Sequence, residues 1–372
     1  MLNTGLKIIK TYTVEENIND QLEKLASSSK EKNMSLVKIQ AWFFPLMILL
    51  IGISNILVVF VGGIQYMNNE IELGILAEFI IYVNLLTWPV ATVGWITSIV
   101  QQAEASQKRI NEFLKTNSSI TNKSKSNKKI EGKIDFNNVD FTYPETKITA
   151  NNNISFTINK GESIAIMGDV GSGKTTLLEL LCRVYDPSKG EILFDNINIK
   201  KINIKELRKS IGYVPQSTFL FSDTIKRNIK FGNYNASMTE VKNAAKNACL
   251  SKDINAFRNK YETLLGERGV NLSGGQKQRM AIARALIKKP KILILDDSLS
   301  AVDTETEKEI LSNINKFSKK ITLIIATHRI SSAKKCDKIL VLENGKVIEF
   351  GSHKELIKNK RYYSRAVLKQ SS

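Results

Sequence analysis

The chain has 372 residues, which is long enough for two domains that each bury a hydrophobic core. Its formal net charge is +18, from 54 Lys and Arg against 36 Asp and Glu, but only residues 122–133 form a basic run, which favours a solvated surface over a nucleic-acid site. The three cysteines lie too far apart for a CxxC or zinc pattern, and their places in the C-terminal part of the chain suit a reducing cytosol.

Residues 1–38 have the pattern of a polar helix, and we expect them to form a cytoplasmic helical extension. No Lys or Arg then occurs between Lys38 and Lys108. Two apolar stretches lie in this gap, at residues 42–64 and 75–100, and each is long enough to cross a hydrocarbon core about 30 Å thick. Residues 39–115 are therefore predicted to be two transmembrane helices with a cytoplasmic extension. A soluble helical hairpin with one buried face is the alternative.

The loop between the two stretches carries Glu70 and Glu72 and no basic residue, whereas both outer flanks are rich in lysine. The positive-inside rule predicts that both ends face the cytoplasm and that this loop lies outside, as in a multi-pass protein of the cell membrane. Glu78, Asn84 and Pro89 interrupt the second stretch, so we expect that part to face protein or a water-filled cavity rather than lipid.

Residues 116–133 are rich in Asn, Ser and Lys and are predicted to be a polar linker. Strand patterns follow at residues 134–143, 154–159 and 163–167. The last of these leads into a glycine-rich loop and a helical pattern at residues 177–184, which is the order of strand, GxxxxGK[ST] loop and helix. A chance glycine-rich turn would not account for the strand before it and the helix after it.

Phosphate binding explains the residue types of this loop. Glycine lets backbone N–H groups turn inward around phosphate oxygens, and the following helix presents its positive N-terminal end to the same anion. We expect Lys174 to neutralise the β- and γ-phosphates of ATP and the Thr175 hydroxyl to hold Mg²⁺. The nucleotide-binding residues predicted here are Gly168, Gly171, Ser172, Gly173, Lys174, Thr175 and Thr176.

Residues 292–295 form a continuous apolar run, typical of a buried parallel strand, and Asp296 and Asp297 follow it. Ligands bind at the carboxyl ends of such strands. Asp296 is therefore predicted to hold Mg²⁺ and Asp297 to orient the attacking water. Two acidic residues after a strand can also simply cap the next helix, but the phosphate loop favours the catalytic interpretation.

A second anion site is predicted at the start of a helix that runs through Arg284. It consists of Ser273, Gly274, Gly275 and Gln276, which follow Leu272. Because the chain already has a phosphate loop, this site is expected to close over ATP held by a partner chain. Together with the motifs above, the run resembles the signature of the ABC transporter superfamily (ATP-binding cassette), and residues 134–372 resemble its ATP-binding domain.

The resemblance implies roles for further residues. Tyr143 would stack on adenine, Gln216 would sense Mg²⁺ and contact the membrane domain, and His328 would be the γ-phosphate switch, so that Asp297, His328 and Gln216 form the catalytic set. Thr175, Gln216 and Asp296 would hold the metal ion. The implied fold is an α/β P-loop ATPase with a helical subdomain at about residues 217–290, preceded by an all-α membrane helical hairpin.

Two features depart from the family pattern. Active members carry Glu at the position of Asp297, and the shorter side chain draws its carboxylate back by about an ångström, which can lower the rate on the order of 100-fold. This resembles one subunit of heterodimeric multidrug exporters, so a second half-transporter is the expected partner; a homodimer that tolerates Asp is the alternative.

Residues 4–14 resemble a coupling segment and the two apolar stretches resemble the last two membrane helices of an exporter half, so we expect a chain truncated at its N-terminus.

The sequence therefore predicts the ATP-hydrolysing subunit of an ABC-type membrane exporter. Its partners would be membrane lipid and a small-molecule export substrate of multidrug, lipid-like or peptide-like kind, with no nucleic acid. One rival is a soluble ABC ATPase that acts on nucleic acid or the ribosome, which the net charge favours. The other is a regulatory or vestigial subunit that binds ATP with little turnover, which Asp297 favours.

Overall fold

The computed structural model describes residue 6 and residues 9–116, 118–122, 129–318 and 321–371. The chain divides into two compact units, Met1–Asn117 and Ser118–Ser372, which we call the helical unit and the α/β unit. Residues 4, 5, 7 and 8 of the predicted coupling segment, and residues 117 and 123–128 of the predicted linker, lie outside the described residues.

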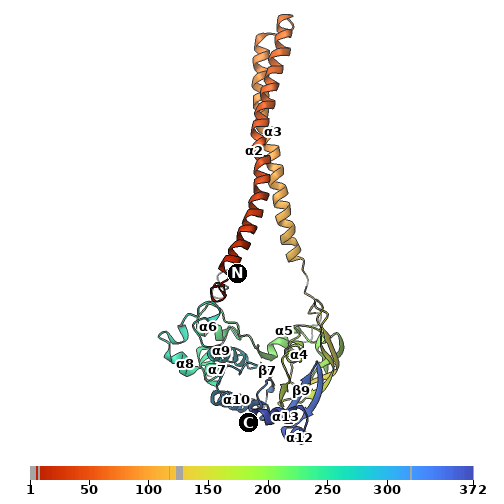
Figure 1. Cartoon of the computed structure of the whole chain (residues 1–372), viewed down its shortest axis with the longest axis vertical. Coiled ribbons are helices and arrows are strands. Elements are labelled where there is room, and N and C mark those ends of the chain that lie inside the picture. Colours follow the sequence, from red (N-terminus) through yellow and green to blue (C-terminus); the bar gives the residue numbers. More distant parts are fainter. Residues whose placement is uncertain (1–5, 7–8, 117, 123–128, 319–320, 372) are drawn as a thin grey trace. The chain divides into compact units, whose positions relative to one another are not determined.

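Two long helices dominate the helical unit, α2 (Glu15–Met67) and α3 (Leu73–Leu114), and they pack side by side (Figure 1). The turn between them contains Asn69 with a φ of 60°, a left-handed conformation that asparagine tolerates better than most residues. At Gly62 an added Cβ would lie 2.6 Å from a Leu76 side-chain carbon, so the absence of a side chain lets the helices approach closely.

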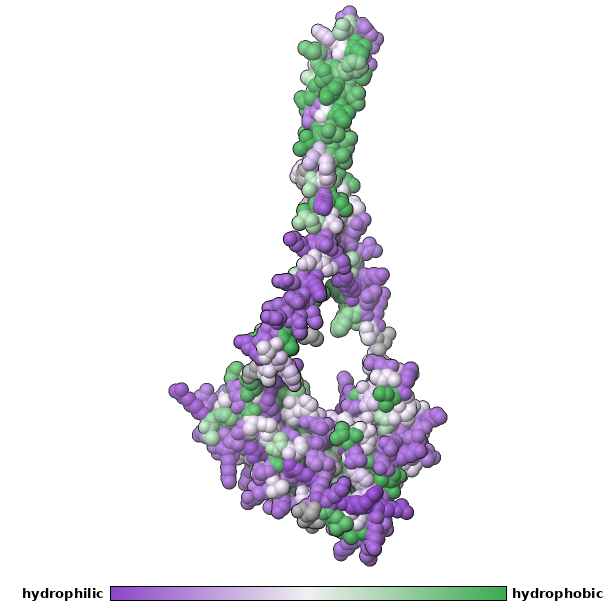
Figure 2. Space-filling model, viewed as in Figure 1, coloured by the Kyte–Doolittle hydropathy of each residue, from purple (hydrophilic) through white to green (hydrophobic). Residues whose placement is uncertain are grey.

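Both helices are long and apolar enough to cross a membrane, judged by length and composition. Their large apolar side chains are exposed on the unit, as at Trp42 (73%) and Trp88 (78%). Figure 2 shows hydrophobic residues gathered along one stretch of the helix pair. Exposing an apolar surface of this extent to water is unfavourable, so we expect it to be covered by lipid or by further helices.

The strands of the α/β unit form two sheets. A four-stranded antiparallel sheet has the order β2-β1-β4-β5, and a six-stranded sheet has the order β10-β9-β3-β8-β7-β6. In the second sheet β10 is antiparallel to β9, and the other neighbours are parallel. The strand bounds are β1 (Ile134–Thr142), β2 (Thr149–Ile158), β3 (Ser163–Met167), β4 (Lys189–Phe194), β5 (Ile197–Asn198), β6 (Ile211–Val214), β7 (Ile292–Asp296), β8 (Thr322–Ala326), β9 (Lys338–Glu343) and β10 (Lys346–Gly351).

The six-stranded sheet is buried on both faces because its central strands are almost entirely apolar, with a polar residue only at an end of each. Alternate residues of β3 enter different cores: Ile164 and Ile166 pack with the antiparallel sheet and α4, whereas Ala165 and Met167 pack with the helices that follow β6. This burial on both faces is typical of parallel strands and explains the continuous apolar runs in the sequence.

Helices cover both faces of the sheet. Those of the α/β unit are α4 (Lys174–Leu181), α5 (Ile204–Ser210), α6 (Ile225–Lys230), α7 (Met238–Asn247), α8 (Ser251–Ala256), α9 (Gly274–Leu286), α10 (Thr304–Ser318), α11 (Ile330–Ala333), α12 (His353–Lys358) and α13 (Tyr362–Ser371), with 3-10 turns at Ile199–Lys201, Lys260–Glu262 and Glu267–Gly269. The run from α6 to α9 lies within the range predicted for the helical subdomain. The architecture agrees with the predicted fold class, an α/β domain with a helical subdomain that follows a helical hairpin.

One strand begins earlier than the sequence predicts. β2 starts at Thr149 rather than Ile154, and it includes the polar run Asn151 to Asn153. Pairing with β1 extends the strand to this earlier start. Asn151 lies opposite Phe141 in the ladder, and this pairing outweighs the low strand propensity of asparagine. Asn153 has a φ of 51°, a left-handed conformation that a β-bulge accommodates. The register between β1 and β2 is irregular in this region.

Candidate active site

Three loops meet at the carboxyl edge of the six-stranded sheet, after β3, β7 and β8. The register pairs Ile166 of β3 with Ala326 of β8, and Ala326 with Asp296 of β7. Because the strands are parallel neighbours, the glycine-rich loop, the two acidic residues and His328 leave the sheet on the same side. This is the edge at which α/β folds bind ligands.

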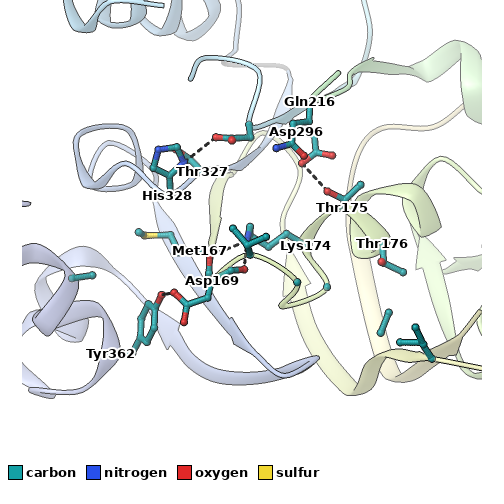
Figure 3. Close-up of a pocket in the computed structure, with 18 of the residues that line it drawn as sticks. Met167, Asp169, Lys174, Thr175, Thr176, Gln216, Asp296, Thr327, His328 and Tyr362 are labelled. Atoms are coloured by element: carbon teal, nitrogen blue, oxygen red, sulfur yellow. Dashed lines mark hydrogen bonds and ion pairs between the residues drawn. The ribbon is translucent and has the colours of Figure 1, made fainter. Parts of the chain in front are cut away.

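The three loops line one cavity of about 570 Å³, a size typical of small-molecule sites (Figure 3). The predicted residues that line it are Tyr143, Gly168, Gly171, Gly173, Lys174, Thr175, Thr176, Gln216, Asp296, Asp297 and His328. Further lining residues that the sequence analysis did not identify are Ile148, Thr149, Ala150, Met167, Asp169, Val170, Thr327, Tyr362, Ala366 and Gln370.

Lys174 is held inside the loop that precedes it. Its Nζ donates to the backbone oxygens of Gly168 at 2.8 Å and Asp169 at 2.7 Å, and to Ser172 Oγ at 3.3 Å. Burial lowers the pKa of Lys174, while the nearby carboxylates of Asp297, Asp169 and Asp296 act in the opposite direction. The ammonium group is thus partly desolvated, which strengthens its attraction for an anion.

Two glycines of the loop cannot carry a side chain. A Cβ at Gly168 would lie 2.2 Å from the Leu342 carbonyl oxygen, and one at Gly173 would lie 2.4 Å from that of Ala150. Gly173 also has a φ of 95° as the residue that caps the N-terminus of α4. The loop backbone is therefore pressed against neighbouring segments, so that its N–H groups can face an anion at the helix N-terminus.

Asp296 is the most buried acidic group at this edge, with 2% of its surface exposed. Thr175 Oγ1 donates to its Oδ1 and the Tyr213 hydroxyl to its Oδ2, each at 3.3 Å. Burial raises the pKa of Asp296, and these two hydrogen bonds oppose that shift. Burial and the neighbouring Asp296 also raise the pKa of Tyr213, which keeps it a donor.

These groups fit a magnesium ion bound together with a nucleotide. Among the residues that the structure describes, no cluster of three or more His, Cys, Asp or Glu side chains is arranged to hold a metal alone. Mg²⁺ does not need such a cluster, because it keeps several waters and takes one or two protein ligands plus substrate phosphates. Thr175, Asp296 and Gln216 lie in the same cavity and are the residues that would hold it.

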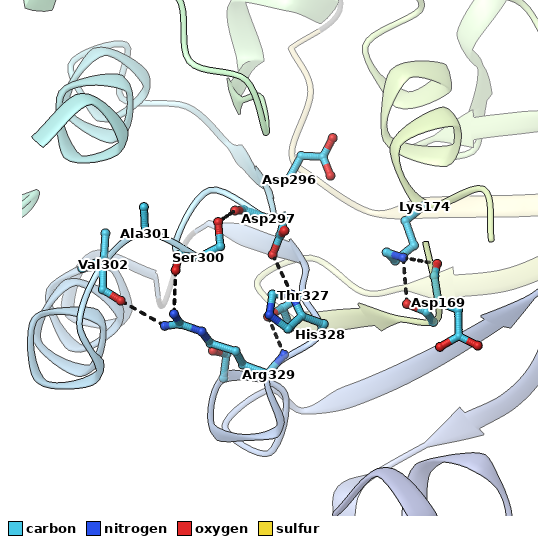
Figure 4. Close-up of polar contacts among 12 residues, drawn as sticks. Asp169, Lys174, Asp296, Asp297, Ser300, Ala301, Val302, Thr327, His328 and Arg329 are labelled. Atoms are coloured by element: carbon cyan, nitrogen blue, oxygen red, sulfur yellow. Dashed lines mark hydrogen bonds and ion pairs between the residues drawn. The ribbon is translucent and has the colours of Figure 1, made fainter. Parts of the chain in front are cut away.

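Asp297 and His328 form a pair across two loops (Figure 4). Asp297 Oδ1 lies 3.2 Å from His328 Nδ1, and the Asp297 N–H donates to the Ala326 carbonyl oxygen at 3.0 Å. His328 keeps 61% of its side chain exposed, whereas Asp297 keeps 23%. The histidine is therefore accessible from the cavity and is oriented by the acidic residue.

Arg329 ties the His328 loop to the segment after Asp297 (Figure 4). Its guanidinium donates to the backbone oxygens of Ser300 at 2.6 Å and Val302 at 3.0 Å, and to the buried Glu307 carboxylate at 2.6 Å. Ser300 Oγ in turn donates to the Asp297 backbone oxygen at 2.8 Å. Residues 300–303 and the His328 loop are thus bonded to each other within one chain.

Tyr143 lines the cavity with a fixed ring. Its hydroxyl lies 2.8 Å from Thr176 Oγ1, and its ring meets Phe141 and Tyr185 edge to face, with centroids 5.0 and 5.6 Å away. An aromatic ring fixed in this way can stack on a flat base without losing further freedom.

The predicted second anion site lies elsewhere. Ser273, Gly274, Gly275 and Gln276 do not line the cavity. Ser273 caps α9 and exchanges hydrogen bonds with Gln276, whose amide also donates to Asp253 Oδ1 at 2.9 Å. An added Cβ at Gly275 would lie 2.9 Å from the Ala301 carbonyl oxygen, so this helix end packs against residues 300–303.

Three of the residues that the sequence analysis missed come from α13. Tyr362, Ala366 and Gln370 are spaced by four and share one helix face, which lines the cavity. The Tyr362 hydroxyl donates to Asp169 Oδ1 at 2.7 Å, and Gln370 Nε2 donates to the His328 carbonyl oxygen at 2.7 Å. The spacing indicates a common face, but nothing in the sequence indicates what that face contacts.

Comparisons with known proteins show which families the chain resembles. The family model described as ABC transporter matches residues 151–300, and the model described as ABC transporter transmembrane region matches residues 4–90. The chain is 40% identical, over 97% of its length, to the probable multidrug resistance ABC transporter ATP-binding/permease protein YheI of Bacillus subtilis, of which it covers 62%. It is 36% identical, over 97% of its length, to the multidrug resistance-like ATP-binding protein MdlA of Escherichia coli, of which it covers 61%.

A solved structure of a bacterial Atm1-family ABC exporter with ATP bound is similar over 100% of this chain and 66% of that one, with a TM-score of 0.93 and 30% identity. The chain spans about three fifths of the length of the curated relatives it matches, since it covers 62% and 61% of the two named above.

Proposed function

The chain belongs to the ABC transporter family, and from that premise we propose that it is an ATP-hydrolysing subunit of an exporter. It is a membrane protein with its nucleotide-binding domain in the cytoplasm. One observation carries the proposal: Lys174, Asp296, Asp297 and His328, which three separate segments supply, line a single cavity. A loop that only stabilised the fold would not need an ammonium, two carboxylates and an imidazole on one cavity wall.

In the proposed reaction, Lys174 and the loop N–H groups bind the β- and γ-phosphates of ATP. Asp297 orients a water molecule for in-line attack on the γ-phosphorus, the bond from that phosphorus to the β,γ-bridging oxygen breaks, and ADP and phosphate are released. We assign His328, which Asp297 orients, to a hydrogen bond with the γ-phosphate. Mg²⁺, when bound, would neutralise charge on the phosphate oxygens.

The partner in this proposal is a second half-transporter. Ser273, Gly274 and Gly275 lie outside the cavity of their own chain, which supports a role at the nucleotide of the partner. A heterodimer is favoured over a homodimer because Asp297 is shorter than the glutamate usual in the family. The names of the two relatives refer to multidrug resistance, so we propose a small amphipathic, lipid-like or peptide-like molecule as the export substrate.

Asp297 also favours a second candidate function, a subunit that binds ATP and hydrolyses it little. Such a subunit would regulate or complete its partner's site without turnover of its own. Both functions use the nucleotide cavity, and they differ in the rate of ATP hydrolysis. Nucleotide binding is therefore the first property to measure, because both functions require it. The soluble rival that acts on nucleic acid does not account for the two exposed apolar helices.

Lys174→Ala tests the site. We expect this change to weaken Mg·ATP binding about 10- to 150-fold, because a hydrogen bond to a charged group contributes about 1.5–3 kcal/mol. Titration of the full chain in lipid nanodiscs with a fluorescent ATP analogue measures the affinity. Lys160→Ala is the matched control, since Lys160 pairs with Glu131 on the surface and does not line the cavity.

Unchanged affinity in Lys174→Ala would refute the nucleotide site. An equal loss of affinity in Lys174→Ala and Lys160→Ala would show that the positive charge of the domain in general, rather than this loop, attracts the nucleotide.

A further inference from the structure

We infer that Tyr362 is a positioning residue of the phosphate site, whose hydroxyl holds the Asp169 carboxylate so that it does not compete with the triphosphate for Lys174. The inference deepens the proposed function and rests on ATP binding at this cavity. It assigns to α13 a part in nucleotide affinity.

The position of α13 is fixed from the side opposite the cavity. Tyr363 is fully buried, its hydroxyl lies 2.7 Å from His353 Nδ1, and its N–H donates to the buried Glu349 carboxylate at 3.2 Å. Because neighbouring residues on a helix point in different directions, this anchor leaves Tyr362 on the face toward the cavity. Tyr362 is therefore held in place before any nucleotide binds.

Asp169 lies between Tyr362 and Lys174 (Figure 3). Its carboxylate accepts the Tyr362 hydroxyl at 2.7 Å, while its backbone oxygen accepts Lys174 Nζ, also at 2.7 Å. The carboxylate is close enough to act electrostatically on the lysine, since it opposes the lowering of the Lys174 pKa that burial causes. Burial and the hydrogen bond to Asp169 raise the pKa of Tyr362 to about 12, so the hydroxyl remains protonated and donates at neutral pH.

A carboxylate in this position competes with a phosphate. If the Tyr362 hydroxyl were absent, the Asp169 side chain could rotate about its χ angles and pair directly with the Lys174 ammonium. The triphosphate would then have to displace that pair, and the freed carboxylate would also repel its charge. The hydroxyl prevents both effects by holding the carboxylate on the α13 side.

The other end of α13 contacts the second loop of the cavity. Gln370 Nε2 donates to the His328 carbonyl oxygen at 2.7 Å, and Gln370 Oε1 accepts the Ile330 N–H at 2.9 Å. One helix is thus bonded to the phosphate loop through Tyr362 and to the His328 loop through Gln370. This second contact fixes the direction of the helix, so that loss of the Tyr362 hydroxyl alone should not displace it.

A double-mutant cycle tests the inference. The variants are Tyr362→Phe, Asp169→Asn and the double variant, each as the full chain in lipid nanodiscs, titrated with Mg²⁺ and methylanthraniloyl-ATP. Tyr362→Phe should weaken binding about 3- to 10-fold, which corresponds to one hydrogen bond. Asp169→Asn should bind at least as tightly as the unchanged chain, because a neutral amide forms no ion pair with Lys174 and does not repel phosphate. In the Asp169→Asn background, Tyr362→Phe should change the affinity less than about 2-fold.

Tyr234→Phe is the matched control, because this exposed tyrosine lies outside the cavity and its variant should bind like the unchanged chain. An equal loss from Tyr362→Phe in both backgrounds would overturn the inference and show that the hydroxyl only supports packing. No loss in either background would also overturn it. If the unchanged chain shows no binding that depends on Lys174, the proposed function fails first, and with it the inference.

Discussion

Asp297 Oδ1 lies 3.2 Å from His328 Nδ1, so the residue after β7 and the second residue after β8 form one pair at the edge of the sheet. Asp297 has a φ of 42°, a left-handed conformation in which aspartate is more common than most other residues. The short side chain and its histidine partner keep the carboxylate near the strand ends.

Asp297→Glu is expected to raise ATP turnover of the assembled transporter. The added methylene extends the carboxylate toward the γ-phosphate, and a gain of about 10- to 100-fold matches the sensitivity of catalysis to a displacement of this size. Phosphate release by the chain purified with its partner measures the gain. Asp297→Asn keeps the length but removes the charge, and it should lower turnover. Brisk hydrolysis by the chain as a pure homodimer, unchanged by Asp297→Glu, would contradict the heterodimer proposal.

Two glycines of the phosphate loop form a matched pair for testing how tightly the loop is packed. A Cβ at Gly173 would lie 2.4 Å from a carbonyl oxygen, whereas nothing lies within 4 Å of a Cβ at Gly171; their φ angles are 95° and 81°. Gly171→Ala should therefore cost about 1–2 kcal/mol of unfolding free energy from conformation alone. Gly173→Ala should cost more and should also remove nucleotide binding. Thermal unfolding and ATP titration of both variants measure this, and equal losses would contradict the predicted collision.

Removing the Arg329 guanidinium should destabilise the α/β unit. Glu307 is buried, with 3% of its side chain exposed, and it accepts hydrogen bonds from Arg329 and the Ser332 hydroxyl. Arg329→Ala leaves that carboxylate without its charge partner, a change that typically costs about 3–5 kcal/mol. Denaturant unfolding of the full chain measures the loss. Arg279→Ala, which breaks the pair with the more exposed carboxylate of Asp253, should cost less; if it costs as much, burial of Glu307 does not govern the effect.

The three cysteines should react slowly with thiol reagents in the folded chain. Burial raises the pKa of Cys182 and of Cys336 to about 12 and the pKa of Cys249 to about 11. Since the thiolate is the reactive form, labelling at pH 8 should be about 10²- to 10³-fold slower than for an ordinary thiol. A colorimetric disulfide reagent, used before and after unfolding, measures this. Rapid reaction of any native cysteine would contradict the packing described for it.

The low reactivity of these thiols allows a direct test of membrane topology. Asn68→Cys places a thiol in the turn between α2 and α3, and Asn33→Cys places one on the polar part of α2. In intact cells a membrane-impermeant maleimide should label Asn68→Cys and should label Asn33→Cys only after the cells are opened, because acidic residues flank the first position and lysines the second. The opposite pattern would reverse the proposed orientation.

Local patterns predicted much of this protein. The two apolar stretches, the strand before the phosphate loop and the apolar run before Asp296 can be recognised from adjacent residues, because side-chain period and transfer free energy are local properties. The signature run that begins at Leu272 likewise indicates the family within five residues. The start of β2 could not be predicted in this way, since pairing with β1 outweighs the low strand propensity of Asn151.

The sequence by itself determined the fold class, the phosphate loop and the acidic residues at the end of β7, since each depends on neighbours in the chain. Only the tertiary structure decided which distant groups complete the cavity: Tyr362 meets Asp169 because α13 packs beside the loop after β3, and Arg329 meets Glu307 because α10 packs near the loop after β8. The physical reason is that a hydrogen bond needs its two atoms within about 3 Å. When two partners belong to different elements, their spacing along the chain does not determine the distance between them. That distance is set by how the two hydrophobic cores pack against the faces of one sheet.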